Sequence, residues 1–187
     1  MKKFKLDKPR EKCGVFGVSN HEDASALVAL GLHALQHRGQ EGCGISTYDG
    51  KTFHLEKRQG LVGDHFTNPD IIKKLPGRSA IGHNRYSTTG ETSLRNIQPF
   101  FADLYASGVS LAHNGNLTNA MSLRNSLVKD GAIFRTTSDT ETIVQLIAKS
   151  NREKMTDKII DALFQIQGAY ALVMMTNKKL IGIRDPI

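Results

Sequence analysis

The sequence predicts an α+β fold in which antiparallel sheets are covered by helices, and three observations lead to this. Two strand-like segments, residues 42–50 and 51–59, join at Asp49-Gly50, and Asp-Gly is a strong hairpin signal. A second strand pair, within 169–185, turns around Asn177. Three helical segments follow one another late in the chain instead of alternating with single strands. That grouping favours antiparallel over parallel sheets.

The first part of the chain is expected to run from a leader into a strand and a helix. Residues 1–12 are charged and read as a flexible leader. An apolar, glycine-rich strand begins at Cys13, and a helix over 24–37 ends before Gly39. Residues 78–88 are predicted to be a strand that continues into a polar loop.

The second part is expected to contribute one further strand and three helices before the final pair. The strand over 108–115 should end in a tight turn at Asn114-Gly115. Helices are predicted over 119–129 and 157–167. The helix between them should begin with a capping box, in which Ser138 is the N-cap and Glu141 reaches back from position N3.

Composition describes an ordinary globular protein. The 187 residues are 39% hydrophobic and 23% charged, and no apolar run approaches the ~20 residues that span a bilayer. We therefore expect a cytoplasmic protein without membrane contact. The formal charge is +7, but residues 1–12 hold six basic and two acidic residues, which leaves only +3 on the remainder. Because no basic helix or aromatic RNA-binding motif accompanies that charge, no nucleic-acid partner is predicted.

The two cysteines, Cys13 and Cys43, indicate neither a disulfide framework nor the paired spacing of a zinc site, so no metal site is predicted. Taken by itself, Cys13 is best explained as a small buried residue that opens a strand. Alternatively, removal of the leader would give it a free α-amine. Such an amine titrates near ~7.7–8.0 and can act as the base for its own thiol.

Four other short motifs have a structural interpretation, and two of them also have a functional one. Arg38-Gly39 suits a helix end, and Arg85 could be a solvated arginine or could grip a carboxylate with its planar fork. Asn114-Gly115 is a turn signal, yet an amide side chain and a backbone N–H also make an oxyanion hole. Asp139 stabilises a helix start through its charge.

Taken together and in this order, these motifs resemble those of class II glutamine amidotransferases, which are N-terminal-nucleophile hydrolases. The matching segments are CGVFGV, LQHRGQEG, GHNRYSTTG, AHNGNLTN and TSDTE. The resemblance implies a four-layer αββα sandwich of two antiparallel sheets that covers residues 13–187. Within the class, the residues of LQHRGQEG, RYSTTG and HNGNLTN are similar to the corresponding motifs of amidophosphoribosyltransferases. The short leader also resembles the propeptide of some family members.

The resemblance implies a catalytic centre around Cys13, which would attack the glutamine side-chain carbonyl. Asn114 and the Gly115 N–H would hold the oxyanion, while Arg38 and Gly39 would line the site beside the thiol. A bound glutamine would then be released as glutamate, with ammonia as the second product.

The same resemblance implies substrate-binding roles on two further motifs. Arg85 would bind the α-carboxylate of glutamine and Asp139 its α-ammonium. Thr88 would add a polar contact, and Tyr86 with its loop would close over the site.

For the complete enzyme, the resemblance implies a phosphoribosyltransferase domain that this chain lacks. Ammonia would there convert phosphoribosyl pyrophosphate to 5-phosphoribosylamine, the first step of de novo purine biosynthesis. Mg²⁺ and a homo-oligomeric assembly are expected with that domain. Any iron–sulfur cluster is also expected there, since two cysteines cannot supply four cluster ligands. Two alternatives stay open from the residues: a glutaminase domain of another class II enzyme, such as glucosamine-phosphate synthase, or a non-catalytic relic.

Overall fold

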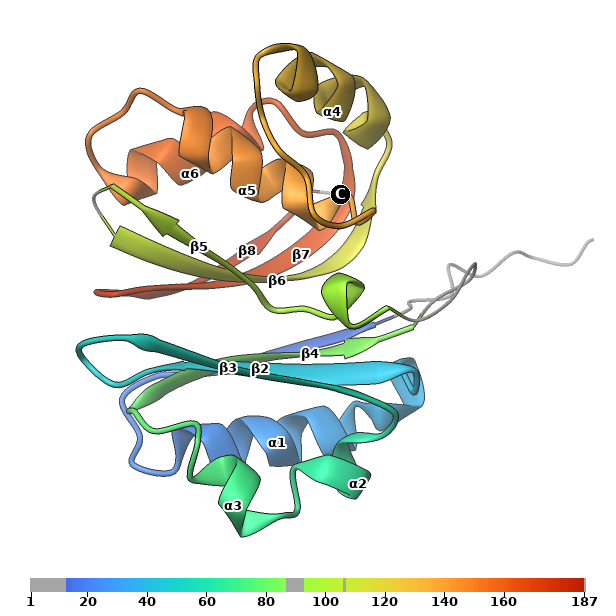
Figure 1. The fold of residues 1–187 in the computed structure, drawn as a ribbon, viewed down its shortest axis with the longest axis vertical. Coiled ribbons are helices and arrows are strands. Elements are labelled where there is room, and N and C mark those ends of the chain that lie inside the picture. Colours follow the sequence, from blue (N-terminus) through green and yellow to red (C-terminus); the bar gives the residue numbers. More distant parts are fainter. Residues whose placement is uncertain (1–12, 87–92, 106, 187) are drawn as a thin grey trace, which may run out of the picture.

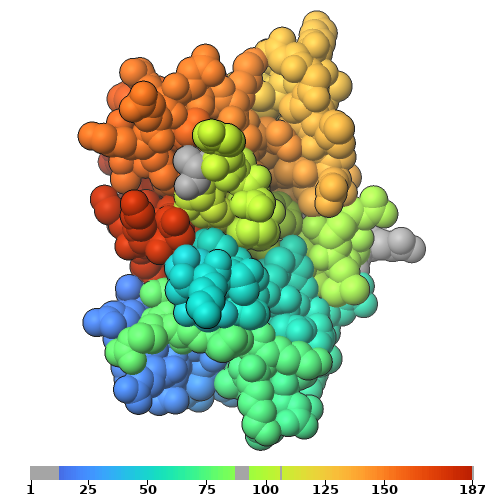
Figure 2. All heavy atoms as spheres, turned by 60° about the vertical axis from the view of Figure 1, so that its left-hand side comes forward, coloured from blue at the N-terminus to red at the C-terminus, as the bar shows by residue number. Residues whose placement is uncertain are grey.

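Two antiparallel four-stranded sheets lie face to face in the computed structural model, and helices cover the outer face of each (Figure 1). The structure describes residues 13–86, 93–105 and 107–186. The layers are α1–α3, the sheet β1-β4-β2-β3, the sheet β5-β6-β7-β8, and α4–α6. Seen as spheres, the early half of the chain forms one block and the later half the other (Figure 2). The predicted α+β fold, a four-layer αββα sandwich, is confirmed.

The first sheet, which we call the N-terminal sheet, places β4 between β1 and β2. The strands are β1 (Gly14–Val18), β2 (Gly42–Tyr48), β3 (Phe53–Gln59) and β4 (Ser79–Arg85). The predicted hairpin is confirmed, because Asp49 Oδ1 accepts the N–H of Lys51 and of Thr52 at 2.8 Å across the turn. Gly14 pairs with Asn84, so the start of β1 and the end of β4 meet at one end of the sheet.

Helix α1 (Ala24–Ala34) covers this sheet, followed by the 3₁₀ turn η1 (Gln36–Arg38) and two short helices, α2 (Val62–His65) and α3 (Pro69–Ile72). The helix predicted over 24–37 therefore ends early. Gln36 is the cause, since its side chain accepts the Val62 N–H at 2.8 Å and donates to the Gly39 carbonyl, which draws the chain out of the helix. The sequence patterns did not predict α2 and α3.

The second sheet, the C-terminal sheet, consists of β5 (Phe100–Leu104), β6 (Ser107–Leu117), β7 (Gly168–Thr176) and β8 (Leu180–Arg184). The predicted pair around Asn177 is confirmed as β7 and β8. The predicted tight turn at Asn114-Gly115 is wrong. β6 continues to Leu117, because its residues stay paired with β7 as far as Gly168. A Cβ on Gly115 would lie 2.2 Å from a β7 carbonyl oxygen, so the glycine permits close strand approach there.

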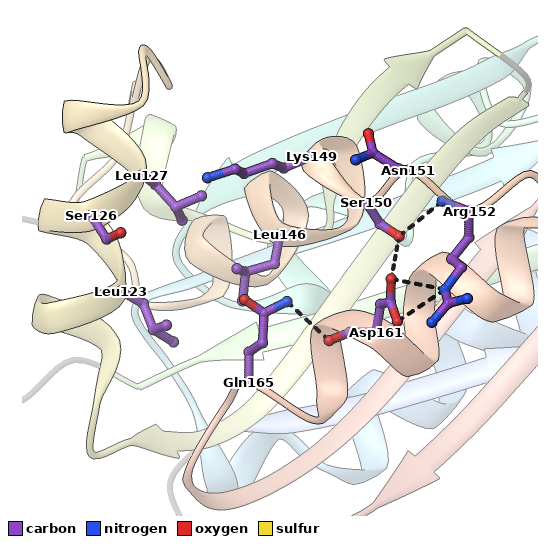
Figure 3. A pocket seen from close by; sticks show the side chains of 10 residues that line it. All are labelled: Leu123, Ser126, Leu127, Leu146, Lys149, Ser150, Asn151, Arg152, Asp161 and Gln165. Atoms are coloured by element: carbon purple, nitrogen blue, oxygen red, sulfur yellow. Dashed lines mark hydrogen bonds and ion pairs between the residues drawn. The ribbon is translucent and has the colours of Figure 1, made fainter.

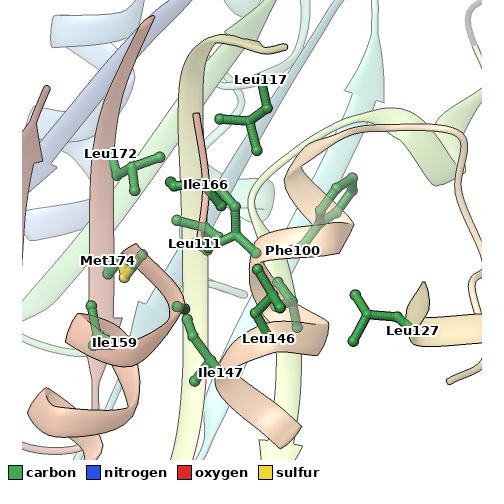
Figure 4. Close-up of a cluster of buried hydrophobic side chains, with 13 residues drawn as sticks. Phe100, Leu111, Leu117, Leu127, Leu146, Ile147, Ile159, Ile166, Leu172 and Met174 are labelled. Carbon is green, nitrogen blue, oxygen red and sulfur yellow. The ribbon is translucent and has the colours of Figure 1, made fainter. Parts of the chain in front are cut away.

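Helices α4 (Ala120–Lys129), α5 (Thr140–Lys149) and α6 (Met155–Leu163) cover the C-terminal sheet. Their apolar faces and the outer faces of β6 and β7 form the largest core (Figure 4). The prediction of α4 is confirmed. Helix α6 ends four residues before the expected Gln167, since the Asn119 side chain donates to the Gln165 carbonyl and accepts the Gln167 N–H. None of the described helices exceeds 11 residues, and none is long and apolar enough to cross a membrane.

The predicted capping box at α5 does not form. Asp139 is the N-cap residue, and Ser138 Oγ accepts the N–H of Thr140 at 3.3 Å, two residues on. Glu141 turns away, and its two oxygens accept the N–H groups of Arg135 and Thr136 at 2.8 and 2.7 Å. The carboxylate therefore shapes the loop before the helix, where it satisfies two backbone donors instead of one.

The inner faces of the two sheets form a smaller core that contains Ile81, Ala112 and Met175, with Val15 packed against it. Because side chains alternate along a strand, Cys13 shares the inner face with Val15, and Arg85 shares it with Ile81. By the same alternation, Asn114 shares the inner face of the C-terminal sheet with Ala112. The functional candidates thus lie on surfaces that face each other.

The close approach of the chain to β2 predicts a strong effect of one glycine substitution. A Cβ on Gly44 would lie 2.3 Å from the Gln98 carbonyl oxygen, whereas a Cβ on Gly182 of β8 would meet nothing within 4 Å. Gly44→Ala should lower the free energy of unfolding by about 1–3 kcal/mol. Gly182→Ala should leave it unchanged or raise it slightly. Chemical denaturation measures both, and equal effects would contradict the packing described here.

Candidate active site

Cys13 lies at the entrance to β1, half-buried, with its backbone fixed by Arg38. The Cys13 N–H donates to the Arg38 carbonyl at 2.9 Å, and Arg38 Nε donates to the Cys13 carbonyl at 2.8 Å. The Cys13 backbone has φ of +86°, a left-handed conformation that L residues seldom adopt. These reciprocal bonds hold the cysteine in a fixed orientation at the start of the strand.

The thiol of Cys13 contacts the backbone of Tyr86. The Tyr86 N–H donates to Sγ at 3.4 Å, and Sγ lies 3.7 Å from the Tyr86 carbonyl oxygen. Burial raises the pKa of the Cys13 thiol, the Tyr86 backbone bond and the charge of Arg85 lower it, and the charges of Asp139 and Glu41 raise it. Burial is the largest of these effects, so the surroundings keep the sulfur protonated.

Arg85 ends β4 on the inner face, next to Gly39. A Cβ on Gly39 would lie 2.7 Å from the Arg85 carbonyl oxygen, so only glycine allows this approach. The Arg85 guanidinium donates from NH1 to the Asn96 carbonyl at 3.1 Å, while its buried Nε–H meets no acceptor among the described residues. The fork therefore keeps hydrogen-bonding capacity for a carboxylate.

Asp139 projects from the start of α5 and is held by β6. Its Oδ2 accepts the Leu117 N–H at 3.0 Å, and its Oδ1 lies 3.4 Å from the Thr140 hydroxyl and 3.7 Å from His113 Nδ1. Burial lowers the pKa of His113, although the charge of Asp139 raises it. A quarter of the Asp139 side chain stays exposed, so a cation can reach it.

Asn114 and Gly115 lie on β6 between His113 and Leu117, the two residues of that strand that contact Asp139. Asn114 is half-buried and Gly115 is exposed. No hydrogen bond joins the Asn114 carboxamide to another described residue. The amide therefore keeps hydrogen-bonding capacity for a bound molecule.

The structure brings most of the predicted site residues to one end of the sandwich. Cys13, Arg38, Gly39, Arg85 and Tyr86 touch directly or through one backbone group. The charge of Asp139 acts on Cys13 from the opposite layer. Thr88 lies outside the described residues. The thiol of Cys13, the guanidinium of Arg85 and the carboxylate of Asp139 therefore lie close enough for both charges to shift the pKa of the thiol.

A hollow of about 450 Å³ lies elsewhere, among α4, α5 and α6 (Figure 3). Ser150 Oγ donates to Asp161 at 2.8 Å, and Arg152 Nε donates to the same carboxylate at 3.3 Å. The Ser150 bond is the main cause that lowers the pKa of Asp161. These bonds tie the end of α5 to α6, and none of the predicted site residues lines this hollow.

Sequence reasoning missed the polar residues that support the site. The side chains of four residues join β6 to the start of α5, and the backbone carbonyl of one of them, Asn96, also accepts from Arg85 of β4. The four are Asn96, Gln98, Thr137 and Thr140. Their only signal in the sequence is the density of amides and hydroxyls in NIQPF and TTSDTE. Such composition is equally typical of a solvated loop.

Comparison with known proteins defines the class. Residues 83–187 match the model of the glutamine amidotransferase domain. The chain is 54% identical over 180 residues to an amidophosphoribosyltransferase of Rhizobium etli, and the match covers 96% of this chain and 36% of the relative. It is 46% identical over 178 residues to an amidophosphoribosyltransferase of Lacticaseibacillus casei, and that match covers 94% of this chain and 91% of the relative.

A solved structure agrees with these relatives. The glutamine phosphoribosylpyrophosphate amidotransferase from B. subtilis, complexed with ADP and GMP, superposes with a TM-score of 0.85 at 42% identity. The match covers 92% of this chain and 37% of that one. The chain is thus a glutamine amidotransferase domain. It belongs to the amidophosphoribosyltransferase family, as the motifs predicted, and it spans little more than a third of the Rhizobium relative.

The electrostatics around Cys13 predict how its alkylation depends on pH. Because burial raises its pKa, alkylation by iodoacetamide in the chain that retains residues 1–12 should have a pH midpoint above the ~8.5 of a free cysteine. Arg85→Gln should raise the midpoint further and Asp139→Asn should lower it. Mass spectrometry resolves Cys13 from Cys43, whose buried thiol has a pKa of about 12 and should stay unmodified. Shifts of the opposite sign would contradict this geometry.

Proposed function

We propose that this chain hydrolyses glutamine to glutamate and ammonia, with the thiol of Cys13 as the nucleophile. The observation that carries the proposal is the convergence of that thiol with the charges of Arg85 and Asp139, which both act on it. A free α-amino acid has one carboxylate and one ammonium, and these two side chains offer the matching pair. The membership of the family supports glutamine as the amide.

Activation of the thiol is proposed to require removal of residues 1–12. Burial raises the pKa of Cys13, so a base must take its proton. In the intact chain the Cys13 nitrogen is an amide that donates to the Arg38 carbonyl. After cleavage it becomes an α-amine with a pKa near ~7.7–8.0, which suits a base at neutral pH. The Arg38 carbonyl would keep that amine in place.

The proposed reaction then proceeds through a thioester. The α-amine accepts the thiol proton as Cys13 Sγ attacks the side-chain carbonyl carbon of glutamine. Asn114 and the Gly115 N–H donate to the oxyanion. The amine returns its proton to the departing nitrogen, the C–N bond breaks, and ammonia leaves. Water then attacks the thioester carbon, which releases glutamate and restores the thiol.

In the complete enzyme, we propose that this ammonia attacks phosphoribosyl pyrophosphate and displaces pyrophosphate, which gives 5-phosphoribosylamine. The support is the name shared by the relatives at 44–54% identity. Transfer of the phosphoribosyl group, Mg²⁺ binding, any iron–sulfur cluster and assembly into a homo-oligomer are proposed for the remainder of the enzyme. Cys13 and Cys43 alone could not hold such a cluster.

Processing provides the direct test of the amine mechanism. The chain that begins at Cys13 should hydrolyse glutamine about 10²–10⁴ times faster than the uncleaved chain, because only the first has the base. Intact mass and N-terminal sequencing define the two samples, and a coupled glutamate assay measures the rates. Selective acetylation of the Cys13 α-amine should reduce the mature chain to the uncleaved rate. Equal activity of cleaved and uncleaved chains would refute the mechanism.

The oxyanion role of Asn114 predicts an effect on turnover more than on binding. Asn114→Ala should lower kcat about 10²–10³-fold and change KM little, because charge on the oxygen develops only in the transition state. Asn116→Ala is the matched control, since Asn116 is exposed on the same strand and the same face. Steady-state glutamine kinetics of both variants decide the question. A change confined to KM would move Asn114 out of the oxyanion hole.

A further inference from the structure

Residues 96–98 pass between the two sheets beside the candidate site. They begin at the last residue of the 3₁₀ turn η2 (Leu94–Asn96), and they pack against β2, where Gly44 leaves room for the Gln98 carbonyl oxygen. Asn96 and Gln98 are only 8% and 5% exposed. Amide side chains this deeply buried must find partners for several donors and acceptors, so their bonds are costly to break.

Asn96 joins Arg85 to the turn before α5. Its backbone carbonyl accepts from Arg85 NH1 at 3.1 Å. Its side-chain Nδ2 donates to Thr137 Oγ1 at 3.0 Å, and its Oδ1 accepts the Thr137 N–H at 3.1 Å. One residue therefore contacts the arginine of the N-terminal sheet and grips the chain two residues before Asp139.

Gln98 grips the same turn from the other side. Its Nε2 donates to Thr140 Oγ1 at 3.0 Å, and its Oε1 accepts the His113 N–H at 2.7 Å. The Thr140 hydroxyl also lies 3.0 Å from His113 Nδ1 and 3.4 Å from Asp139 Oδ1. These contacts close a ring that links the carboxylate to the strand that carries Asn114.

Arg85 and Asp139 themselves belong to different layers, and no ion pair joins them among the described residues. Their separation thus depends on what lies between them. We propose that Asn96 and Gln98 are positioning residues that set this separation to match the α-carboxylate and α-ammonium of glutamine, and so determine specificity for the free amino acid. This inference rests on the proposed function and extends it to residues that need not touch the substrate.

The test compares glutamine with 5-amino-5-oxopentanoate, which is glutamine without its α-amino group, in the chain that begins at Cys13. Thr137→Val removes only the hydroxyl that accepts from Asn96, and Asn96→Ala removes both side-chain bonds. Each should raise the KM for glutamine roughly tenfold or more, as expected for a displaced charge-assisted contact, with little change in kcat. The KM for the analogue should change much less, so the preference for glutamine should fall.

Gln145→Ala is the matched control, because Gln145 donates to the Ile133 carbonyl on an exposed part of α5. It should leave both KM values unchanged. Should Asn96→Ala prove unstable in thermal unfolding, Thr137→Val carries the test, since Thr137 is exposed. Equal loss of kcat/KM for both substrates, or no loss for either, would overturn the positioning role.

Arg85→Lys and Asp139→Asn, assayed in parallel, separate this proposal from the function on which it rests. If they raise the KM for glutamine while Thr137→Val and Asn96→Ala do not, the proposed glutamine site stands and the positioning role fails. If glutamine KM is unchanged in all four variants, the carboxylate and ammonium sites lie elsewhere, and both proposals fail.

Discussion

The face-to-face packing of the two sheets is the constraint on which the candidate site depends. β1 and β4 place Cys13 and Arg85 on the inner face of one sheet, and β6 places Asn114 on the facing surface. The sheets approach closely where a glycine faces inward. A Cβ on Gly17, for example, would lie 2.8 Å from Val173 of the other sheet. Wider spacing would separate the thiol from the groups contributed by the C-terminal sheet.

The same packing controls which groups are charged. Burial, reinforced by the charge of Arg85, lowers the pKa of His83 to about 3, so this inner-face histidine is neutral at physiological pH. Burial also lowers the pKa of His113. Neutral imidazoles leave Arg85 as the cation and Asp139 as an anion beside Cys13. Neutral His83 and His113 are compatible with the proposed mechanism, in which the α-amine of Cys13 acts as the base for its own thiol.

Much of the fold could be predicted from local sequence, and the failures have identifiable causes. The Asp49-Gly50 hairpin depends on contacts within a few residues, so its signal was reliable. Asn114-Gly115 carries the same kind of signal, yet pairing with β7 keeps it in a strand. At α5, Glu141 satisfies the loop at Arg135 and Thr136 in place of Ser138. A partner distant in the sequence overrode the local preference at Asn114-Gly115, and competing backbone donors five and six residues away overrode it at Glu141.

The sequence by itself determined the family, the layers and most of the candidate site, because Cys13, Arg85, Asn114 and Asp139 stand in motifs whose order and wording are specific. Only the tertiary structure decided how those groups are held. Asn96 and Gln98 gain their importance from burial between the sheets and from partners 15 to 42 residues away along the chain. Local sequence patterns do not reveal such partners. An Asn or Gln residue looks the same in the sequence whether its side chain is solvated in a loop or joins two layers of the fold.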